Sequence, residues 1–268
     1  MNLIRIDSDL EFLGPSRVER LDLYRPAETL PSSPVVIFLH GGAFHRGDKA
    51  SERSQTLCRL LAESGVAALS VNYKLSPGAQ GDERWEAWPT NLMDASAALS
   101  FVGERAESLG LDAARIAVAG TSAGATLALL LAFGAADSMV GEAISPCIRA
   151  VVNFYGRVDW TRHTVREKLP SSPEIAREAS PLTWIDAGGK TPAVLTIHGD
   201  ADEVVPVEHA RILDKALARC GSSHELVILP GAPHAFAVEP APETIRERLT
   251  GFLAAQLQPN AAPARSEI

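Results

Sequence analysis

The stretch from Arg115 to Leu131 constrains the fold of this chain more than any other. It reads as a short apolar strand, a turn of small residues and an apolar helix, with Gly-Thr-Ser-Ala-Gly in the middle. A serine at such a turn takes a strained backbone conformation, and the residues two positions away on each side come close together. Gly120 and Gly124 lack the side chains that would collide there. The pattern predicts that Ser122 is raised clear of a sheet above a helix N-terminus, which favours negative charge.

The pentapeptide by itself has a second interpretation, which is a glycine-rich loop with an ordinary N-capping serine. The strand before it and the long apolar helix after it are the context in which such a serine acts as a nucleophile. This context favours the catalytic interpretation, and the rest of the chain supplies further tests of it.

Length and composition predict one large domain and exclude some partners. The chain has 268 residues, of which 46% are hydrophobic, and its net charge of −8 argues against a basic face for nucleic acid or anionic lipid. Cys58, Cys147 and Cys220 are far apart and odd in number, which is typical of a reducing compartment. With no signal-peptide pattern and no membrane span, we expect a soluble cytoplasmic protein. Association as a homodimer stays open.

Apolar runs of strand length alternate with helical patterns along most of the chain. Such alternation predicts an α/β fold with a mostly parallel sheet of about eight strands covered by helices. We expect one domain over residues 1–257, with a cap-like insertion at 157–190 after the sixth strand and a mobile tail at 258–268. The predicted strands are 17–24 (outer and half-exposed), 35–39, 66–73, 115–119, 148–155, 193–198 and 225–229, and the predicted helices include 51–64, 88–109, 207–219 and 244–257.

A serine nucleophile needs a base, and the base is expected among seven histidines. Ligands of parallel sheets bind beyond the carboxyl ends of the strands, where His234 follows the last strand. We therefore predict His234 as the base. His40 and His198 also end buried strands, and we expect them to bond the backbone and shape their loops. The remaining histidines lie in polar surroundings that favour the surface: His45, His163, His209 and His224.

A third group must orient the imidazole and stabilise its cation, and two aspartates compete for this role. Asp200 is two residues from a strand end and is expected to shape the turn. Asp202 lies further out, where its loop can approach His234, and we prefer it as the catalytic acid. The developing oxyanion needs fixed donors. The backbone N–H of Ala123 is one, and others are expected from the side-chain-poor loop His40-Gly41-Gly42-Ala43.

These pieces resemble the α/β-hydrolase esterases with an HGG oxyanion loop, the hormone-sensitive-lipase-like group. They are most similar to its compact bacterial esterases, including acetyl-xylan and feruloyl esterases, and to kynurenine formamidase. The matching segments are residues 21–26, 40–49, 71–75, 120–124, 179–182, 198–206 and 231–236. The resemblance implies that Gly42, Ala43 and Ala123 donate to the oxyanion and that Gly41 shapes the turn.

Three departures from the family pattern bear on the substrate. Thr121 stands where lipase-like members usually have aspartate, and Ala125-Thr126 replaces the Gly-His of many compact esterases. We expect the N-terminal cap of the lipase-like group to be largely missing. Phe44, Trp160 and Trp184 either line the substrate pocket or pack beneath a surface insertion, and the sequence leaves both interpretations open. We expect Gly47-Asp48-Lys49 to fix a loop. No metal spacing or phosphate-binding motif occurs, so no metal and no cofactor is expected.

The sequence thus predicts a serine carboxylesterase that acts on small soluble esters, with short acyl chains, through Ser122, His234 and Asp202. An amide hydrolase of the kynurenine-formamidase type would use the same triad and remains an alternative. A non-catalytic ligand-binding protein on this fold is a further alternative, although such proteins tend to lose a triad member and all three are present here.

Overall fold

The computed structural model describes residues 4–27, 32–78, 81–141, 147–161, 170, 172–185, 191–237 and 243–259. Eight strands of this described chain form one sheet in the order β1-β2-β4-β3-β5-β6-β7-β8. The strand β2 runs antiparallel to both of its neighbours, and every other pair is parallel. The strands are β1 Ile4–Leu10, β2 Leu21–Pro26, β3 Ser33–Leu39, β4 Ala67–Val71, β5 Leu111–Thr121, β6 Ile148–Phe154, β7 Ala193–Gly199 and β8 His224–Leu229.

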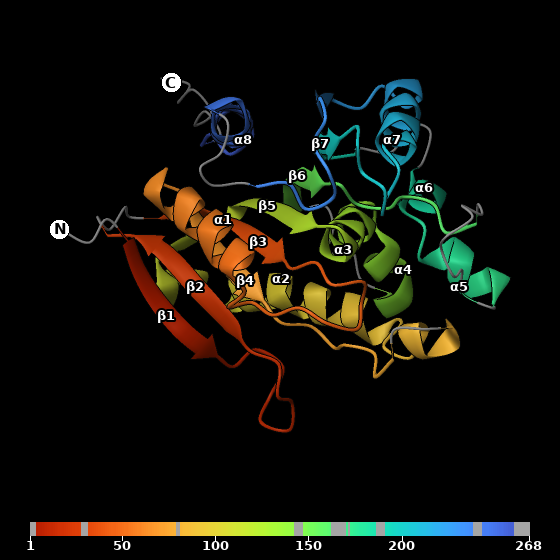
Figure 1. Cartoon of the computed structure of the whole chain (residues 1–268). Coiled ribbons are helices and arrows are strands. Elements are labelled where there is room, and N and C mark those ends of the chain that lie inside the picture. Colours follow the sequence, from red (N-terminus) through yellow and green to blue (C-terminus); the bar gives the residue numbers. More distant parts are fainter. Residues whose placement is uncertain are drawn as a thin grey trace, which may run out of the picture.

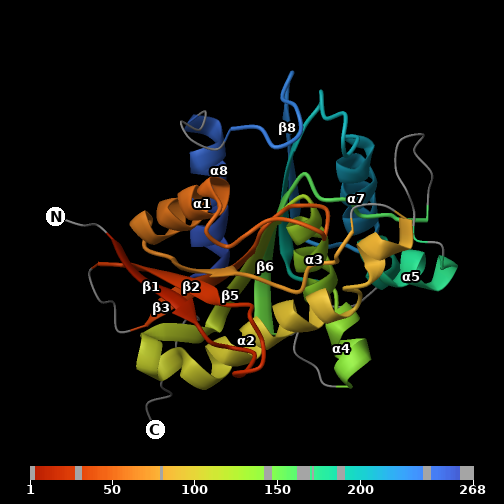
Figure 2. The same cartoon turned by 60° about the horizontal axis from the view of Figure 1, so that its bottom comes forward.

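Helices cover both faces of this sheet (Figures 1 and 2). Side chains of α1 and α8 pack with one face of the strands, and side chains of α2, α3 and α7 pack with the other. The central strands are buried throughout because both faces are covered. The helices are α1 Glu52–Glu63, α2 Thr90–Leu109, α3 Ala123–Ala132, α4 Ala135–Val140, α5 Pro173–Glu178, α6 Pro181–Trp184, α7 Glu208–Arg219 and α8 Glu243–Gln256, with a 3-10 turn η1 at Gly81–Trp85.

The predicted α/β class and the buried parallel strands are confirmed, but the prediction for the start of the sheet is wrong. The outer, half-exposed strand expected at 17–24 begins only at Leu21, and Val18 lies outside it with 86% of its surface exposed. The strand β2 is an inner strand because β1 pairs along its outer edge. Its first four residues are buried for that reason. β1 itself was not predicted, since charged residues alternate through it as they do in exposed segments.

The segment between β6 and β7, where the insertion at 157–190 is predicted, contains the short helices α5 and α6. Residues 162–169, 171 and 186–190 of that insertion lie outside the described residues, and so do residues 260–268 of the predicted tail. The division into one domain, an insertion and a tail stays a prediction.

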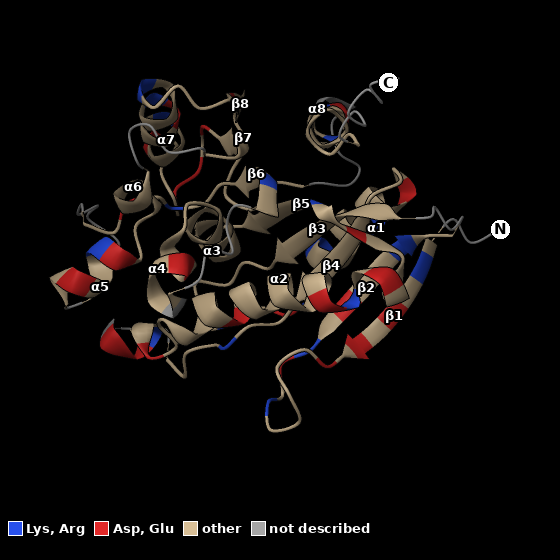
Figure 3. Ribbon diagram, turned by 180° about the vertical axis from the view of Figure 1, so that it is seen from behind, with Lys and Arg blue, Asp and Glu red and all other residues tan. Residues whose placement is uncertain are grey.

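Acidic and basic residues are both present along β1 and α5 in the ribbon of Figure 3. Among the described residues, no helix combines the length and apolar character that crossing a bilayer requires. All three cysteines are present as free thiols.

Candidate active site

Ser122 lies at the sharp turn between β5 and α3. Its backbone has φ 52° and ψ −117°, a conformation that is costly for a residue with a side chain. The turn is held because the N–H of Ser122 donates to the carbonyl of Phe154, on the neighbouring strand, at 2.9 Å. Strain of this kind persists only where the surroundings fix it, and it raises the hydroxyl above the sheet edge.

The two glycines of the turn are required by close backbone contacts, as the sequence predicted. A Cβ on Gly120 would lie 2.4 Å from the carbonyl carbon of Gly124. A Cβ on Gly124 would lie 2.1 Å from the carbonyl oxygen of Leu39, at the end of β3. The helix α3 can therefore approach the strands closely only because neither position carries a side chain.

The structure brings Ser122, His234 and Asp202 into one hydrogen-bonded chain. The Nε2 atom of His234 lies 3.1 Å from the hydroxyl oxygen of Ser122, and its Nδ1 atom lies 2.7 Å from a carboxylate oxygen of Asp202. A carboxylate can only accept, so Nδ1 carries the proton and Nε2 presents its lone pair to the serine. This arrangement allows the imidazole to take the hydroxyl proton.

Asp202 is held as an anion although its side chain is fully buried. Burial alone would raise its pKa, but hydrogen bonds from His198, His234 and the backbone outweigh that effect and hold the pKa of Asp202 well below its ordinary value. The backbone donors are the N–H groups of Val204 and Val205, each 2.8 Å from Oδ1. The carboxylate therefore stays charged and fixed beside His234.

The competing residues take the structural roles expected of them. Asp200 accepts the N–H of Gly231 at 2.6 Å and shapes the turn after β7. The Nδ1 atom of His40 donates to the carbonyl of Gly41, and Nε2 of His198 donates to the carbonyl of Val205, both at 2.8 Å. His198 also lies 3.2 Å from the carboxylate of Asp202, a contact that the sequence did not indicate.

The expected surface position is wrong for one of the other histidines. His209 is buried because it shares the packed face of α7 with Leu213, one turn further on. His45 and His224 are partly buried, and His163 lies outside the described residues.

The loop after β3 passes directly beside the serine turn. A Cβ on Gly41 would lie 3.0 Å from the carbonyl oxygen of Thr121. Gly42 has φ 130° and Ala43 has φ 53°, so the loop takes a left-handed course that few side chains tolerate. Within the described chain, no turn or loop hydrogen bond uses the N–H groups of Gly42, Ala43 or Ala123. These are the three N–H groups that the sequence predicts as oxyanion donors, and Ala43 and Ala123 line the cavity described below.

Polar contacts fix the far end of this loop, as predicted for Gly47-Asp48-Lys49. Asp48 accepts the N–H of Ala50 at 2.7 Å and the side-chain amide of Asn72 at 2.9 Å. The ammonium of Lys49 bonds Asp22 at 2.6 Å and Asp9 at 2.8 Å. The loop is thereby tied to β1, β2 and the residue after β4.

Two residues that hold His234 were not predicted. Tyr155, which follows β6, packs its ring edge-on against the imidazole, with 4.8 Å between ring centroids. Arg53 of α1 donates to the carbonyls of Ala235 and Phe236 at 2.6 and 2.7 Å. No sequence signal could have found Arg53, because it lies more than 180 positions from its partners.

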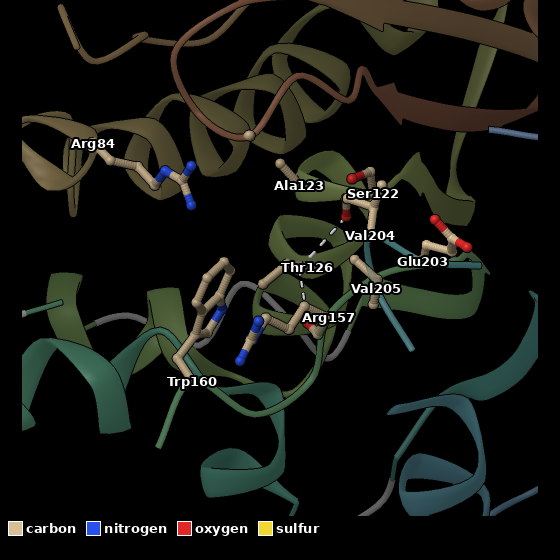
Figure 4. Close-up of a pocket in the computed structure, with 10 residues that line it drawn as sticks. Arg84, Ser122, Ala123, Thr126, Arg157, Trp160, Glu203, Val204 and Val205 are labelled. Atoms are coloured by element: carbon tan, nitrogen blue, oxygen red, sulfur yellow. Dashed lines mark hydrogen bonds between the residues drawn. The ribbon is translucent and has the colours of Figure 1, made fainter. Parts of the chain in front are cut away.

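A cavity of about 400 Å³ opens beside Ser122 (Figure 4). Of the three aromatic residues considered for the pocket, Trp160 lines it, whereas Phe44 and Trp184 do not. Phe44 is buried behind the cavity against Trp160, with 6.0 Å between ring centroids. The indole N–H of Trp184 instead donates to the carbonyl of Glu178 on α5. The full lining is Ala43, Arg84, Ser122, Ala123, Thr126, Arg157, Trp160, Glu203, Val204 and Val205.

Comparison with known proteins places the chain among esterase-like sequences. A profile of the family described as BD-FAE matches residues 21–217. Esterase LipC of Mycobacterium tuberculosis is 32% identical over 83% of this chain and 58% of its own length. Ethyl acetate hydrolase of Pseudomonas putida is 30% identical over 80% of this chain and 70% of its own length. The chain thus spans less than two thirds of LipC.

The crystal structure of esterase LipW from Mycobacterium marinum has the same fold. Its TM-score with this chain is 0.72 at 29% identity, over 95% of this chain and 81% of LipW. The sheet order described above and this likeness confirm the predicted α/β-hydrolase fold.

Proposed function

The chain belongs to the BD-FAE family, and we propose that it is a serine hydrolase that cleaves carboxylic esters through an acyl-enzyme intermediate. The single observation that carries the proposal is the continuous hydrogen-bonded chain from Ser122 through His234 to Asp202. The similarity to esterases in sequence and structure supports the same reaction class.

In this mechanism the hydroxyl oxygen of Ser122 attacks the ester carbonyl while Nε2 of His234 takes its proton. The same proton then passes to the departing alcohol, and a water molecule activated by His234 hydrolyses the acyl-enzyme. Asp202 keeps the proton of the neutral imidazole on Nδ1 and stabilises the imidazolium that forms. Its buried, fourfold-bonded carboxylate suits this role, because it needs no rearrangement when the charge develops.

The negative charge on the tetrahedral intermediate is stabilised by backbone N–H groups. We assign this role to Gly42, Ala43 and Ala123, whose N–H groups make no turn or loop hydrogen bond within the described residues. Ala123 is also the first residue of α3, so its N–H lies at the positive end of a helix dipole.

The size of the cavity and its lining favour small esters. Trp160 forms one wall, and four of the ten lining residues are charged or hydroxyl-bearing besides Ser122, so a long apolar groove is missing from the described site. A long acyl chain gains about 0.8 kcal/mol for each buried CH₂ only where apolar surface receives it. We therefore propose acyl chains of about two to six carbons. The likeness to a protein named ethyl acetate hydrolase supports this choice.

The test is kcat/KM across p-nitrophenyl esters from acetate to palmitate, measured below micelle-forming concentrations and alongside N-formylkynurenine as an amide substrate. Ser122→Ala should fold normally and lose ester hydrolysis by about three or more orders of magnitude. An organophosphonate should add its mass to Ser122.

Adduct formation at another serine would contradict the assignment of the nucleophile. An optimum at ten carbons or more would contradict the short-acyl proposal while leaving the reaction class intact. A higher kcat/KM for the formamide than for every ester would assign the chain to amide hydrolysis by the same triad.

A further inference from the structure

Two arginines lie in the wall of the cavity beside the proposed nucleophile. Arg84 comes from η1 and Arg157 from the segment after β6, more than 70 residues away along the chain. In Figure 4 both guanidinium groups lie with Trp160 on one side of Ser122, and the carboxylate of Glu203 lies on the other side. The cavity therefore has a cationic end and an acidic rim.

Arg157 is held rigidly within this wall. Only 2% of its surface is exposed, its Nε donates to the carbonyl of Asp159 at 2.8 Å, and its guanidinium carbon lies 4.4 Å from the ring centroid of Trp160. The carbonyl of Arg157 accepts the hydroxyl of Thr126, which also lines the cavity. These contacts fix the orientation of a planar cation in the cavity wall, and guanidinium groups are enriched where proteins recognise carboxylates.

The pKa values of the two arginines reflect their partly buried position in this wall. Burial lowers the pKa of Arg157 to about 10; the nearby Asp159 raises it and Arg84 lowers it. Burial also lowers the pKa of Arg84. Two cations in the wall of one partly buried cavity favour the binding of an anion there. The chain as a whole carries a net charge of −8, so this cationic end differs from its overall charge.

We infer that the substrate of this site is an ester bearing a carboxylate, which pairs with Arg84 and Arg157 while the ester carbonyl reaches Ser122. This inference rests on the proposed ester hydrolysis and names its substrate class. The carboxylate belongs either to the acyl part or to the alcohol part of the ester, and two pairs of substrates distinguish these sources.

The acyl pair is the mono-p-nitrophenyl ester of adipic acid and its terminal amide, which is similar in size and neutral. The alcohol pair is 4-acetoxybenzoate and 4-acetoxybenzamide. Because a hydrogen bond to a charged group contributes about 1.5–3 kcal/mol, kcat/KM should be about 10- to 100-fold higher for the anion in one pair. The pair that shows the preference identifies the part of the substrate that carries the charge.

Arg84→Gln should lower that anion-to-amide ratio about tenfold or more. Arg177→Gln is the matched control, since this exposed arginine of α5 lies outside the cavity lining, and it should leave the ratio unchanged. Because Arg157→Gln removes a buried group and can impair folding, wild-type protein supplies a second measurement. Adipate should inhibit cleavage of p-nitrophenyl acetate at a concentration at least tenfold lower than adipamide does.

A wild-type kcat/KM that is the same for the anion and for its amide in both pairs, or stronger inhibition by adipamide than by adipate, would overturn the inference. So would an equal fall in the ratio for Arg84→Gln and Arg177→Gln, which would assign the preference to the overall charge. Failure to cleave any of the four esters would instead contradict the proposed function, so the two failures are distinguishable.

Discussion

Replacing Asp202 by asparagine tests the proposed mechanism at its most constrained point. Oδ1 of Asp202 accepts two backbone N–H groups, and Oδ2 faces Nδ1 of His234 at 2.7 Å and Nε2 of His198 at 3.2 Å. In the variant, the amide oxygen keeps the two backbone donors, so the amide NH₂ takes the place of Oδ2. An NH₂ group only donates, and His234 must then present a lone pair at Nδ1 and carry its proton on Nε2.

That tautomer cannot accept the proton of Ser122. The same substitution in a serine protease triad lowers kcat about 10⁴-fold, which corresponds to about 5.5 kcal/mol of lost transition-state stabilisation. We expect a loss of that order here, because the contacts of Asp202 leave the amide no other orientation that satisfies the N–H groups of Val204 and Val205.

The assay is kcat for p-nitrophenyl acetate at pH 7, with circular dichroism to establish that each variant is folded. Asp200→Asn is the matched control, because its amide oxygen still accepts the N–H of Gly231 and it should change kcat by less than about tenfold. A larger loss in Asp200→Asn than in Asp202→Asn, with both folded, would refute the reasoning and move the catalytic role to Asp200.

Four further predictions follow from the same contacts. The lowered pKa of Asp202 contributes stability that is complete above the unfolded-state pKa of about 3.9 and is lost as the pH falls. In urea unfolding, the free energy of unfolding should therefore decrease below about pH 4, and the decrease should be smaller in Asp202→Asn. Trp160→Ala should move the optimal acyl length upward in the p-nitrophenyl series, and an unchanged optimum, or an equal shift in Trp184→Ala, would contradict the assignment of the cavity wall. Gly124→Ala should lower the free energy of unfolding by about 1–3 kcal/mol or more, because its Cβ would collide with the carbonyl of Leu39. The control is Gly103→Ala on α2, which should leave the free energy of unfolding unchanged or raise it, because the added Cβ has open space. Arg53→Ala should lower kcat about tenfold with little change in KM, because it releases the carbonyls of Ala235 and Phe236 and so loosens the loop of His234. Arg59→Ala, at an exposed position of the same helix, is the control.

The sequence predicted those parts of the fold in which a local pattern and burial agree. Strands buried on both faces are continuous apolar runs, and for that reason the runs at 35–39 and 193–198 were recognised with nearly correct bounds. β1 carries Arg5, Asp7 and Asp9 and lies at the sheet edge, where one side meets solvent, so its pattern resembles a loop. β2 was then placed at the edge because the strand that covers it was missed.

The candidate site was predictable to the extent that it follows from chain order and strand ends. Ser122, Asp202 and His234 each lie in the turn or loop that follows a parallel strand, and the carboxyl ends of such strands share one edge of the sheet. The pocket depends instead on which way side chains turn. Phe44 has φ 65° and points into the core, and no residue pattern distinguishes that outcome from a position in the pocket.

The three hydrogen-bonded residues of the site are held in place by different parts of the fold. Ser122 is fixed by the carbonyl of Phe154 on the neighbouring strand β6, and Asp202 is fixed by the N–H groups of Val204 and Val205 in its own turn. The loop of His234 is held by Arg53 of α1, which is distant along the chain. The position of the base, and with it the 3.1 Å contact to the serine, therefore depends on the packing of α1 against the sheet, whereas the nucleophile and the acid are set by the sheet itself.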